Sequence, residues 1–272
     1  MPSTFLAHQV PAFAAKRKWP QLDGVALVVG SGMPDMAQAF DRRWDGHSLI
    51  DQFLWSLPVG LLLAYLLRQF IAPRLAPYLP DFGHFRLRDY GLVDRHRHTL
   101  WVSAYSVLLG AFSHLVLDQF THPDSWLARQ VHVLQRNAFM VGRHGIEWAL
   151  LLQFVLSAVL SVTAVWQMWR IGKERAVLTW VDLPVGPRPQ PTRPVVPVRV
   201  VFVLGAVVIA WFAWTRVPLG VIVASESAFW LVWVLALATG LVVGPPAEPS
   251  AGSGAEAHSD QPAASPLPPG AT

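Results

Sequence analysis

Long apolar runs separated by short polar segments dominate the chain from about residue 50 onward. Five of these runs cover residues 50–70, 100–118, 146–169, 198–214 and 228–243. Each run approaches the ~20 residues that an α-helix needs to cross the hydrocarbon core of a bilayer. The pattern therefore predicts five transmembrane helices.

The first 50 residues contain only shorter apolar stretches. A short helix is predicted around His8, with a kink at Pro11, because proline lacks the backbone N–H that a helix interior requires. Residues 24–33 are apolar but too few to span a bilayer. We expect a re-entrant or interfacial segment there, ended by Pro34.

Composition agrees with a membrane protein. The 272 residues are 53% hydrophobic and 14% charged, whereas about 25% of the residues in soluble domains are charged. The 13 Trp residues suit the aromatic belts of a membrane interface. The basic residues lie between the apolar runs, so the net charge of +4 concerns membrane orientation and anionic lipids rather than nucleic acid. The absence of Cys excludes disulfides and thiolate metal sites.

We therefore expect an all-α, polytopic helical membrane protein with about five transmembrane helices and short interfacial N-terminal helices. Residues 1–243 are predicted to form one helical membrane domain, in which the Pro-rich linker 182–197 offers a sub-boundary. Residues 244–272 are rich in Pro, Ala, Gly and Ser, which predicts a disordered tail.

The second predicted span carries polar and small side chains at steps of three and four residues, which places them on one helix face. This polar seam consists of Ser103, Ser106, Gly110, Ser113, His114, Asp118 and Thr121. Helix packing accounts for the serines and the glycine, but a carboxylate at membrane depth needs a charged or metal partner. His114 and Asp118 are therefore predicted to be functional. His122 continues the spacing, although Pro123 ends the helix beside it and leaves an ordinary loop position equally open.

Counting the spans brings polar residues of the N-terminal region to the same membrane face as this seam. His8, Asp35 and His47 precede the first span, whereas His114 and Asp118 end the second. Taken singly, each N-terminal residue would be an ordinary cap or surface residue. Taken together, three imidazoles and two carboxylates are a donor set for one or two zinc-like divalent ions.

Two further groups of residues contain histidine and charged side chains and are considered as metal ligands. His144 and Glu147 return to the same face at the start of the third span, where a ligand or supporting role and a simple helix-start role are both open. Residues 94–98 lie at the opposite end of the second span, and their arginines suit anionic lipid headgroups better than a cation. Slightly more Lys and Arg lie on that opposite face, which favours it as the cytoplasmic one.

The order of these motifs resembles a known family. His8, the apolar stretch before Pro34-Asp35, His47-Ser48-Leu49 and the His114…Asp118…His122-Pro123 series together resemble the bacterial integral-membrane family catalogued as domain of unknown function 4184. They are similar, more distantly, to membrane-bound metal-dependent hydrolases of the LexA-regulated inner-membrane type, which themselves resemble zinc-dependent phospholipases C. The resemblance implies a multi-pass protein of the bacterial inner (plasma) membrane. By this resemblance, five residues occupy the ligand positions, namely His8, Asp35, His47, His114 and Asp118.

The leading hypothesis is a metal-dependent hydrolase that acts on a lipid or lipid-linked ester, with a phosphoester preferred. A metal held by His47, His114 and Asp118 would lower the pKa of bound water to about 7, and His8 and Asp35 would complete its shell. The alternative is a non-enzymatic transporter or scaffold that uses the polar seam for ion passage or helix packing. A third hypothesis is a catalytically inactive member whose Pro-rich linker and tail recruit partners.

Overall fold

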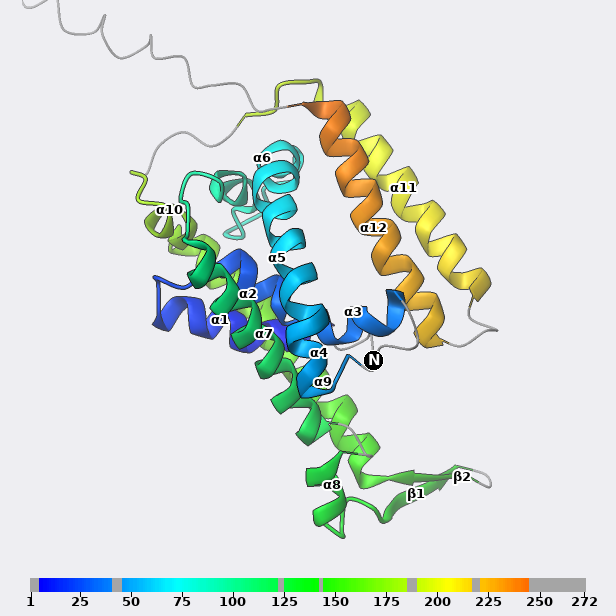
Figure 1. Cartoon of the computed structure of the whole chain (residues 1–272). Helices are drawn as coiled ribbons and strands as arrows, with labels where there is room; N and C mark the ends of the chain where they lie inside the picture. The colour runs from blue at the N-terminus through cyan, green and yellow to red at the C-terminus, as the bar shows by residue number, and fades with distance from the viewer. Residues whose placement is uncertain are drawn as a thin grey trace, which may run out of the picture.

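The computed structural model describes residues 5–40, 46–121, 125–141, 144–184, 190–216 and 221–244. Helices make up most of this part of the chain, and its strands form one small hairpin (Figure 1). The all-α, polytopic class predicted from the sequence is confirmed. The predicted tail lies outside the described residues apart from its first residue, so its disorder stays a prediction, as does the domain division.

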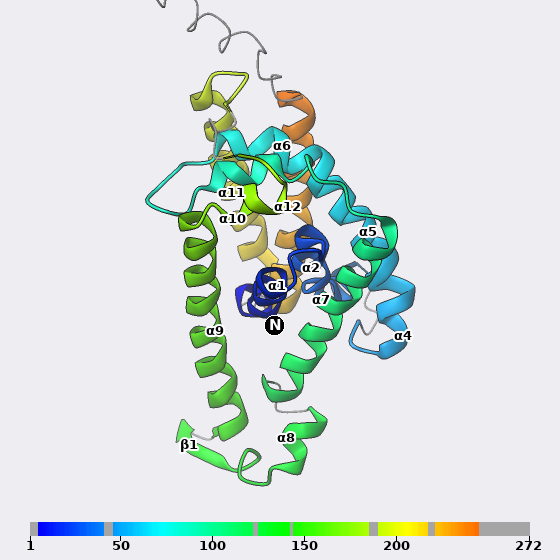
Figure 2. The same cartoon turned by 90° about the vertical axis from the view of Figure 1, so that its left-hand side faces the viewer.

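Three short helices precede the first long one and occupy the middle of the molecule (Figures 1 and 2). They are α1 (Phe5–Lys18), α2 (Gly24–Gly30) and α3 (Met33–Phe40). Helix α1 continues through Pro11 to its C-terminal basic residues. Pro34 follows α2 and also stands in the first turn of α3, where a missing backbone N–H costs little. The apolar segment 24–33 thus becomes a buried helix and the start of the next one.

Four helical segments are long and apolar enough to cross a membrane. These are Leu49–Tyr78, Leu100–Gln119, Trp148–Lys173 and Val195–Thr215. The last three belong to α7 (Leu100–Thr121), α9 (Trp148–Lys173) and α11 (Val195–Arg216). The fifth predicted span corresponds to α12 (Val221–Val243), whose fully described apolar part is Trp230–Val243. Helices α11 and α12 pack against each other as an antiparallel pair (Figure 1).

The first span is one helical stretch with two π-helical interruptions, which occur frequently at functional sites. Its parts are α4 (Leu49–Asp51), η2 (Gln52–Ser56), α5 (Leu57–Leu66), η3 (Leu67–Ile71), α6 (Ala72–Leu75) and the 3₁₀ turn η4 (Ala76–Tyr78). Buried polar side chains in the π turns include Gln52 in η2 and Arg68 in η3. Both take part in the polar clusters described below.

The connection between α7 and α9 differs from the prediction. It contains α8 (Trp126–Gln130) and an antiparallel hairpin of β1 (Asn137–Val141) and β2 (His144–Glu147). The prediction that the third span begins at residue 146 was wrong by two residues. Ile146 and Glu147 are strand, because Ile146 pairs across the hairpin with Phe139, and aromatic and β-branched residues favour such pairs.

Helix packing brings the N-terminal helices against two of the spans. Helix α1 packs along α9, and α2 packs along α7. The main hydrophobic core lies between α2, α3, α5 and α7 and includes Met33, Leu63 and Val107. The remaining helices are α10 (Ala176–Trp180) and the 3₁₀ helix η5 (Leu87–Leu92), which pack beside α6 and α9.

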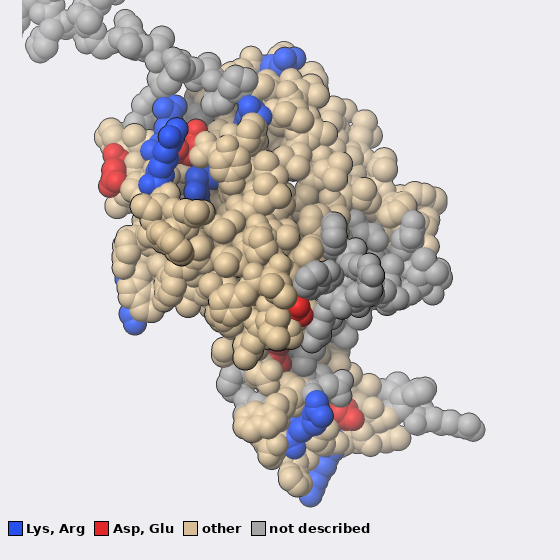
Figure 3. All heavy atoms as spheres, in the orientation of Figure 1, with Lys and Arg blue, Asp and Glu red and all other residues tan. Residues whose placement is uncertain are grey.

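The outer surface suits a bilayer. Large apolar side chains such as Val162 on α9 and Trp211 on α11 are each 70% exposed. On the face shown in Figure 3, most Lys and Arg lie toward the two ends, and few charged side chains lie between them. Exposed apolar helices with charges at their ends are the expected arrangement for a polytopic membrane protein.

Candidate metal centre

The five side chains singled out from the sequence meet beside the C-terminal half of α7. We call them the His/Asp cluster, which consists of His8 on α1, Asp35 on α3, His47 before α4, and His114 and Asp118 on α7. One ligand atom from each of four members lies within 4.8 Å of the others. These four are Asp35, His47, His114 and Asp118. The fifth, His8, places Nε2 3.5 Å from Asp118 Oδ1.

Asp118 lies at the centre of the cluster. Its Oδ2 is 3.1 Å from Nε2 of His47 and 3.2 Å from Nε2 of His114. Asp35 contributes a second carboxylate, whose Oδ1 lies 3.6 Å from Nε2 of His47 and 3.5 Å from Nε2 of His114. The ring of His8 stacks on that of His114, with centroids 3.8 Å apart. Three imidazoles thus direct nitrogen atoms toward two carboxylates.

Close packing of α2 on α7 holds one of these imidazoles in place. A Cβ atom at Gly110 of α7 would collide with the carbonyl oxygen of Leu27, and one at Gly30 would collide with the backbone of α7. Glycine at both positions lets the two helix backbones approach each other. As a result, the carbonyl of Ser31, directly after α2, lies 2.8 Å from Nδ1 of His114.

This contact determines the tautomer of His114. A carbonyl oxygen only accepts hydrogen bonds, so Nδ1 must carry the hydrogen. In the neutral ring Nε2 is then a lone-pair donor, and it points at the oxygens of Asp35 and Asp118. Facing electron-pair donors repel each other unless a cation, either a proton or a metal ion, lies between them. An imidazole that donates its other N–H to a backbone carbonyl is also the usual arrangement of a metal-bound histidine.

A compact loop holds His47. Gly46 has a φ of +70°, a conformation that favours glycine. The buried Gln52 amide donates to the carbonyl oxygens of Gly46 at 2.7 Å and Ser48 at 2.9 Å. The Ser48 hydroxyl caps α4 by accepting the Asp51 N–H at 3.1 Å, and the Asp51 carboxylate accepts the Gly46 N–H at 3.2 Å. These bonds fix the backbone on both sides of His47.

His8 and Asp35, which lie outside the spans, have the protonation states that metal binding requires. Burial, together with the adjacent ring of His114, lowers the pKa of His8 to about 4, so its imidazole is neutral at pH 7. Burial alone would raise the pKa of Asp35, but the close contact with His114 outweighs it and holds that pKa well below its usual range. Metal ligands must be neutral imidazoles and ionised carboxylates.

The cluster is reached from one side. His114 and Asp118 are buried, whereas the side chains of His47 and Asp35 are 29% and 26% exposed. The exposed apolar side chains Leu49, Ile50 and Phe53 follow shortly after His47 in the chain. The accessible side of the cluster therefore lies next to an apolar surface.

Of the three weaker predicted ligands, only Glu147 has a described side chain that can be compared with this group. Glu147 ends β2 at the start of α9 and is not among the described His, Asp and Glu residues whose ligand atoms cluster. Only the backbone of His144 is described, as the first residue of β2. His122 lies outside the described residues. Their metal-binding roles stay predictions.

Three supporting residues were missed by the sequence analysis. These are Gln9, Ser31 and Gln52, which are all fully or almost fully buried. The Ser31 hydroxyl donates to Oε1 of Gln9 at 3.0 Å, directly behind the carbonyl that holds His114. The signal for Gln52 was an amide inside a predicted apolar span, and that for Gln9 was its position beside His8. An uncharged amide is common at surfaces, so neither stood out.

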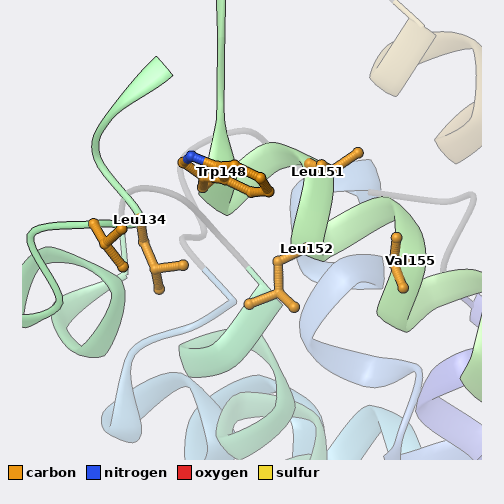
Figure 4. A pocket seen from close by; sticks show the side chains of 6 residues that line it. Leu134, Trp148, Leu151, Leu152 and Val155 are labelled. Atoms are coloured by element: carbon orange, nitrogen blue, oxygen red, sulfur yellow. The ribbon is translucent and has the colours of Figure 1, made fainter. Parts of the chain in front are cut away.

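A hollow at the base of the hairpin has a different character. It has a volume of about 450 Å³ and is lined only by apolar side chains, five of which are labelled in Figure 4. They come from the segment before β1 and from the first turns of α9 and include Leu134, Trp148 and Leu152. No titratable side chain is found among the described residues that line this hollow, so they offer no catalytic group.

The fold and the cluster define a class of protein: a polytopic helical membrane protein with a partly buried His/Asp group that could hold a metal ion. The chain belongs to the family described as Domain of unknown function (DUF4184), which matches residues 1–246 and thus includes all the described helices and the whole cluster. The family resemblance found in the sequence is confirmed, whereas the similarity to metal-dependent hydrolases stays a prediction. Comparison with curated proteins and with solved structures finds no match.

Proposed function

We propose that this protein is a metal-dependent hydrolase that acts on a lipid or lipid-linked ester at the membrane, with a phosphoester as the preferred substrate. The observation that carries the proposal is the convergence of three imidazoles on Asp118, with the Nδ1 hydrogen of His114 already committed to Ser31. A buried carboxylate in an apolar helix requires such a partner set, or a cation, to be tolerated.

A zinc-like divalent ion fits the donor chemistry, because imidazole and carboxylate are its usual ligands in the absence of cysteine. His47, His114, Asp118 and Asp35 would hold it, and His8 would complete or support the shell. Such an ion supplies a water of lowered pKa and polarises a phosphoryl or carbonyl oxygen. The residues themselves orient the donor atoms: Ser31 holds His114, and Gln52 holds the loop of His47.

A lipid is the substrate class that suits the surroundings. The accessible side of the cluster adjoins the exposed apolar residues of α4 and η2, which would lie against acyl chains. A substrate with an apolar tail and an ester group near the membrane surface could reach His47 and Asp35 without leaving the bilayer. We further propose a bacterial inner-membrane location, with the cluster facing outward and residues 94–98 contacting anionic lipids.

The scaffold alternative draws support from the other half of the polar seam. Gly110 lies at the α2 crossing, and Ser103 and Ser106 contact Asp23 at the start of α2. These contacts are helix packing and hydrogen bonding, as a scaffold would use them. A scaffold predicts that Asp118→Asn alters assembly or conduction and leaves metal content unchanged. An inactive member would keep the fold and use its linker and tail to recruit partners.

Metal analysis separates these functions. Detergent-purified wild-type protein should carry stoichiometric zinc, manganese or iron, and both His114→Ala and Asp118→Asn should lose it. His132→Ala, which changes an exposed histidine between α8 and β1, serves as the matched control and should retain the metal. A chelator should abolish hydrolysis of a fluorogenic lipid phosphoester, and added metal should restore it. Wild-type protein that carries no bound metal would contradict the proposal.

A further inference from the structure

A second group of buried charges lies at the other ends of α1 and α7. Lys16, Asp23 and Arg68 are 5%, 1% and 9% exposed. Arg68 donates to Oδ2 of Asp23, and the same carboxylate accepts the Ser103 hydroxyl at 2.6 Å and the Ala26 N–H at 3.1 Å. Lys16 stands eight residues after His8 on α1, about 12 Å along the helix axis. The group is therefore separate from the His/Asp cluster.

Lys16 is held by backbone oxygens and by an aromatic ring. Its Nζ donates to the carbonyl oxygens of Pro20 at 2.6 Å and Leu22 at 2.7 Å. It also lies 5.2 Å from the centre of the Trp180 ring of α10. An ammonium group has three donors, so one N–H is left for another partner. Burial lowers the pKa of Lys16 to about 8, which still leaves it mainly protonated at pH 7.

The charges of this group do not balance. Two cations, Lys16 and Arg68, share one carboxylate, Asp23, so the buried group carries an excess of one positive charge. Buried charges are normally paired or bound to a counter-ion, because an unpaired one is costly. Asp182 also attracts Lys16, but its side chain is 82% exposed and lies against His96, so it does not neutralise the buried group. An anionic ligand would supply the missing negative charge.

These charges line a cavity of about 470 Å³, which we call the cationic cavity. Its walls come from α1, α2, η3, α6, η5, α9 and α10, with single contributions from α11 and α12. Helices α6 and α10 lie on the far side of α1 and α2 from the β-hairpin (Figures 1 and 2). Apart from Tyr90, His96, His98 and the three buried charges, the lining is apolar, with side chains such as Val28, Ile71 and Phe202.

The size and lining of the cavity indicate an amphiphile with one chain. Small-molecule sites have volumes of about 300–1,000 Å³ and are mostly apolar, with a few fixed polar groups. At roughly 30 Å³ for each water-sized group, about fifteen groups fit, which matches one acyl chain rather than the two of a phospholipid. The apolar walls would take the chain, and the uncompensated positive charge would take a carboxylate.

We propose that the cationic cavity binds a long-chain fatty acid, with its acyl chain against the apolar walls and its carboxylate at Lys16 and Arg68. The site goes beyond the proposed hydrolase activity and does not depend on it, since no member of the His/Asp cluster lines the cavity. His96 and His98 also line the cavity. The site nevertheless differs from surface contact between residues 94–98 and anionic lipids, because surface contact needs no cavity for the chain.

Binding of palmitate to delipidated, detergent-purified protein tests this proposal. Palmitate should bind at least tenfold more tightly than methyl palmitate, which has the same chain and no charge. Ala72→Phe, which fills the cavity from α6, should weaken palmitate binding at least tenfold. Ala158→Phe, the same change on the exposed outer face of α9, should leave binding unchanged.

A third variant tests the charge. Lys16→Met should weaken palmitate binding and leave methyl palmitate binding unchanged, provided that its thermal unfolding transition is retained. If Lys16→Met does not fold, the Ala72→Phe variant still tests whether palmitate binds in the cavity. Equal binding of the acid and its methyl ester, or palmitate binding that survives Ala72→Phe, would overturn the proposal. Metal content is measured on the same samples, so failure of the fatty-acid site and failure of the hydrolase proposal are read separately.

Discussion

Single residues outside the ligand set control the His/Asp cluster, and Gln52 is the clearest case. Its amide donates to the carbonyls of both Gly46 and Ser48, on either side of His47. Gln52→Ala removes both bonds and frees the loop, and loss of such an outer partner typically costs about 10–100-fold in metal affinity. A zinc titration against a competing chelator measures the loss. Gln119→Ala, which changes an exposed amide next to Asp118, should have no effect, and equal affinity of all three proteins would contradict the prediction.

At the same scale, the functional role of a charged residue in an apolar run is easier to predict from the sequence than that of an uncharged amide. His114 and Asp118 could be predicted because ionisable groups stand out in an apolar run. Arg68, at the end of the first predicted span, was not singled out from the sequence, and the structure pairs it with a buried carboxylate, Asp23. The roles of Gln52 and Ser31 could not be predicted. Gln52 acts by donating to the carbonyl of Ser48, and Ser31 acts through its own carbonyl, which faces His114. Only the fold determines these contacts.

Among the elements, the crossing of α2 and α7 positions His114. Gly110→Ala would drive a methyl group into the Leu27 carbonyl and push α2 away from α7. Overpacking of this kind costs about 1–3 kcal/mol, and it would also withdraw the Ser31 carbonyl from His114. We expect a lower thermal unfolding midpoint in detergent together with weaker metal binding.

The matched control is Gly240→Ala on α12, where a Cβ would meet the Phe70 carbonyl oxygen at an ordinary distance of 3.4 Å. Because alanine has a higher helix propensity than glycine by roughly 1 kcal/mol, this variant should be neutral or slightly more stable. If Gly110→Ala behaves in the same way, the close crossing does not position the site.

Helix positions could be predicted because twenty apolar residues in succession have few alternatives. The first span begins at Leu49 and α11 begins at Val195, each within a few residues of the prediction. The β-hairpin was missed because its strands are short, and the second continues directly into an apolar helix at Trp148. Pairing across the hairpin, a contact between separate segments, decides that boundary rather than local propensity.

For the whole molecule, the even number of spans between two segments (the parity of spans) explains why distant segments can meet on one membrane face. Residues before the first span and residues ending the second must lie on one face, which is why His47 can reach Asp118 across 71 positions. The same reasoning separates the His/Asp cluster from the cationic cavity, because Ser103 and Asp118 stand at opposite ends of α7. Parity relates the two ends of the molecule to each other without assigning either to a compartment.

Orientation is the last prediction, and the chain is well suited to testing it because it contains no cysteine. His132→Cys places a thiol beside the hairpin, on the face of the His/Asp cluster, and Phe82→Cys places one in the loop before η5, on the opposite face. Neither substitution removes a Lys or Arg, so the basic residues that favour one orientation are unchanged. A membrane-impermeant maleimide added to intact cells should label residue 132 at once and residue 82 only after permeabilisation. The reverse pattern would place the cluster in the cytoplasm, and its substrate would then be a lipid of the inner leaflet.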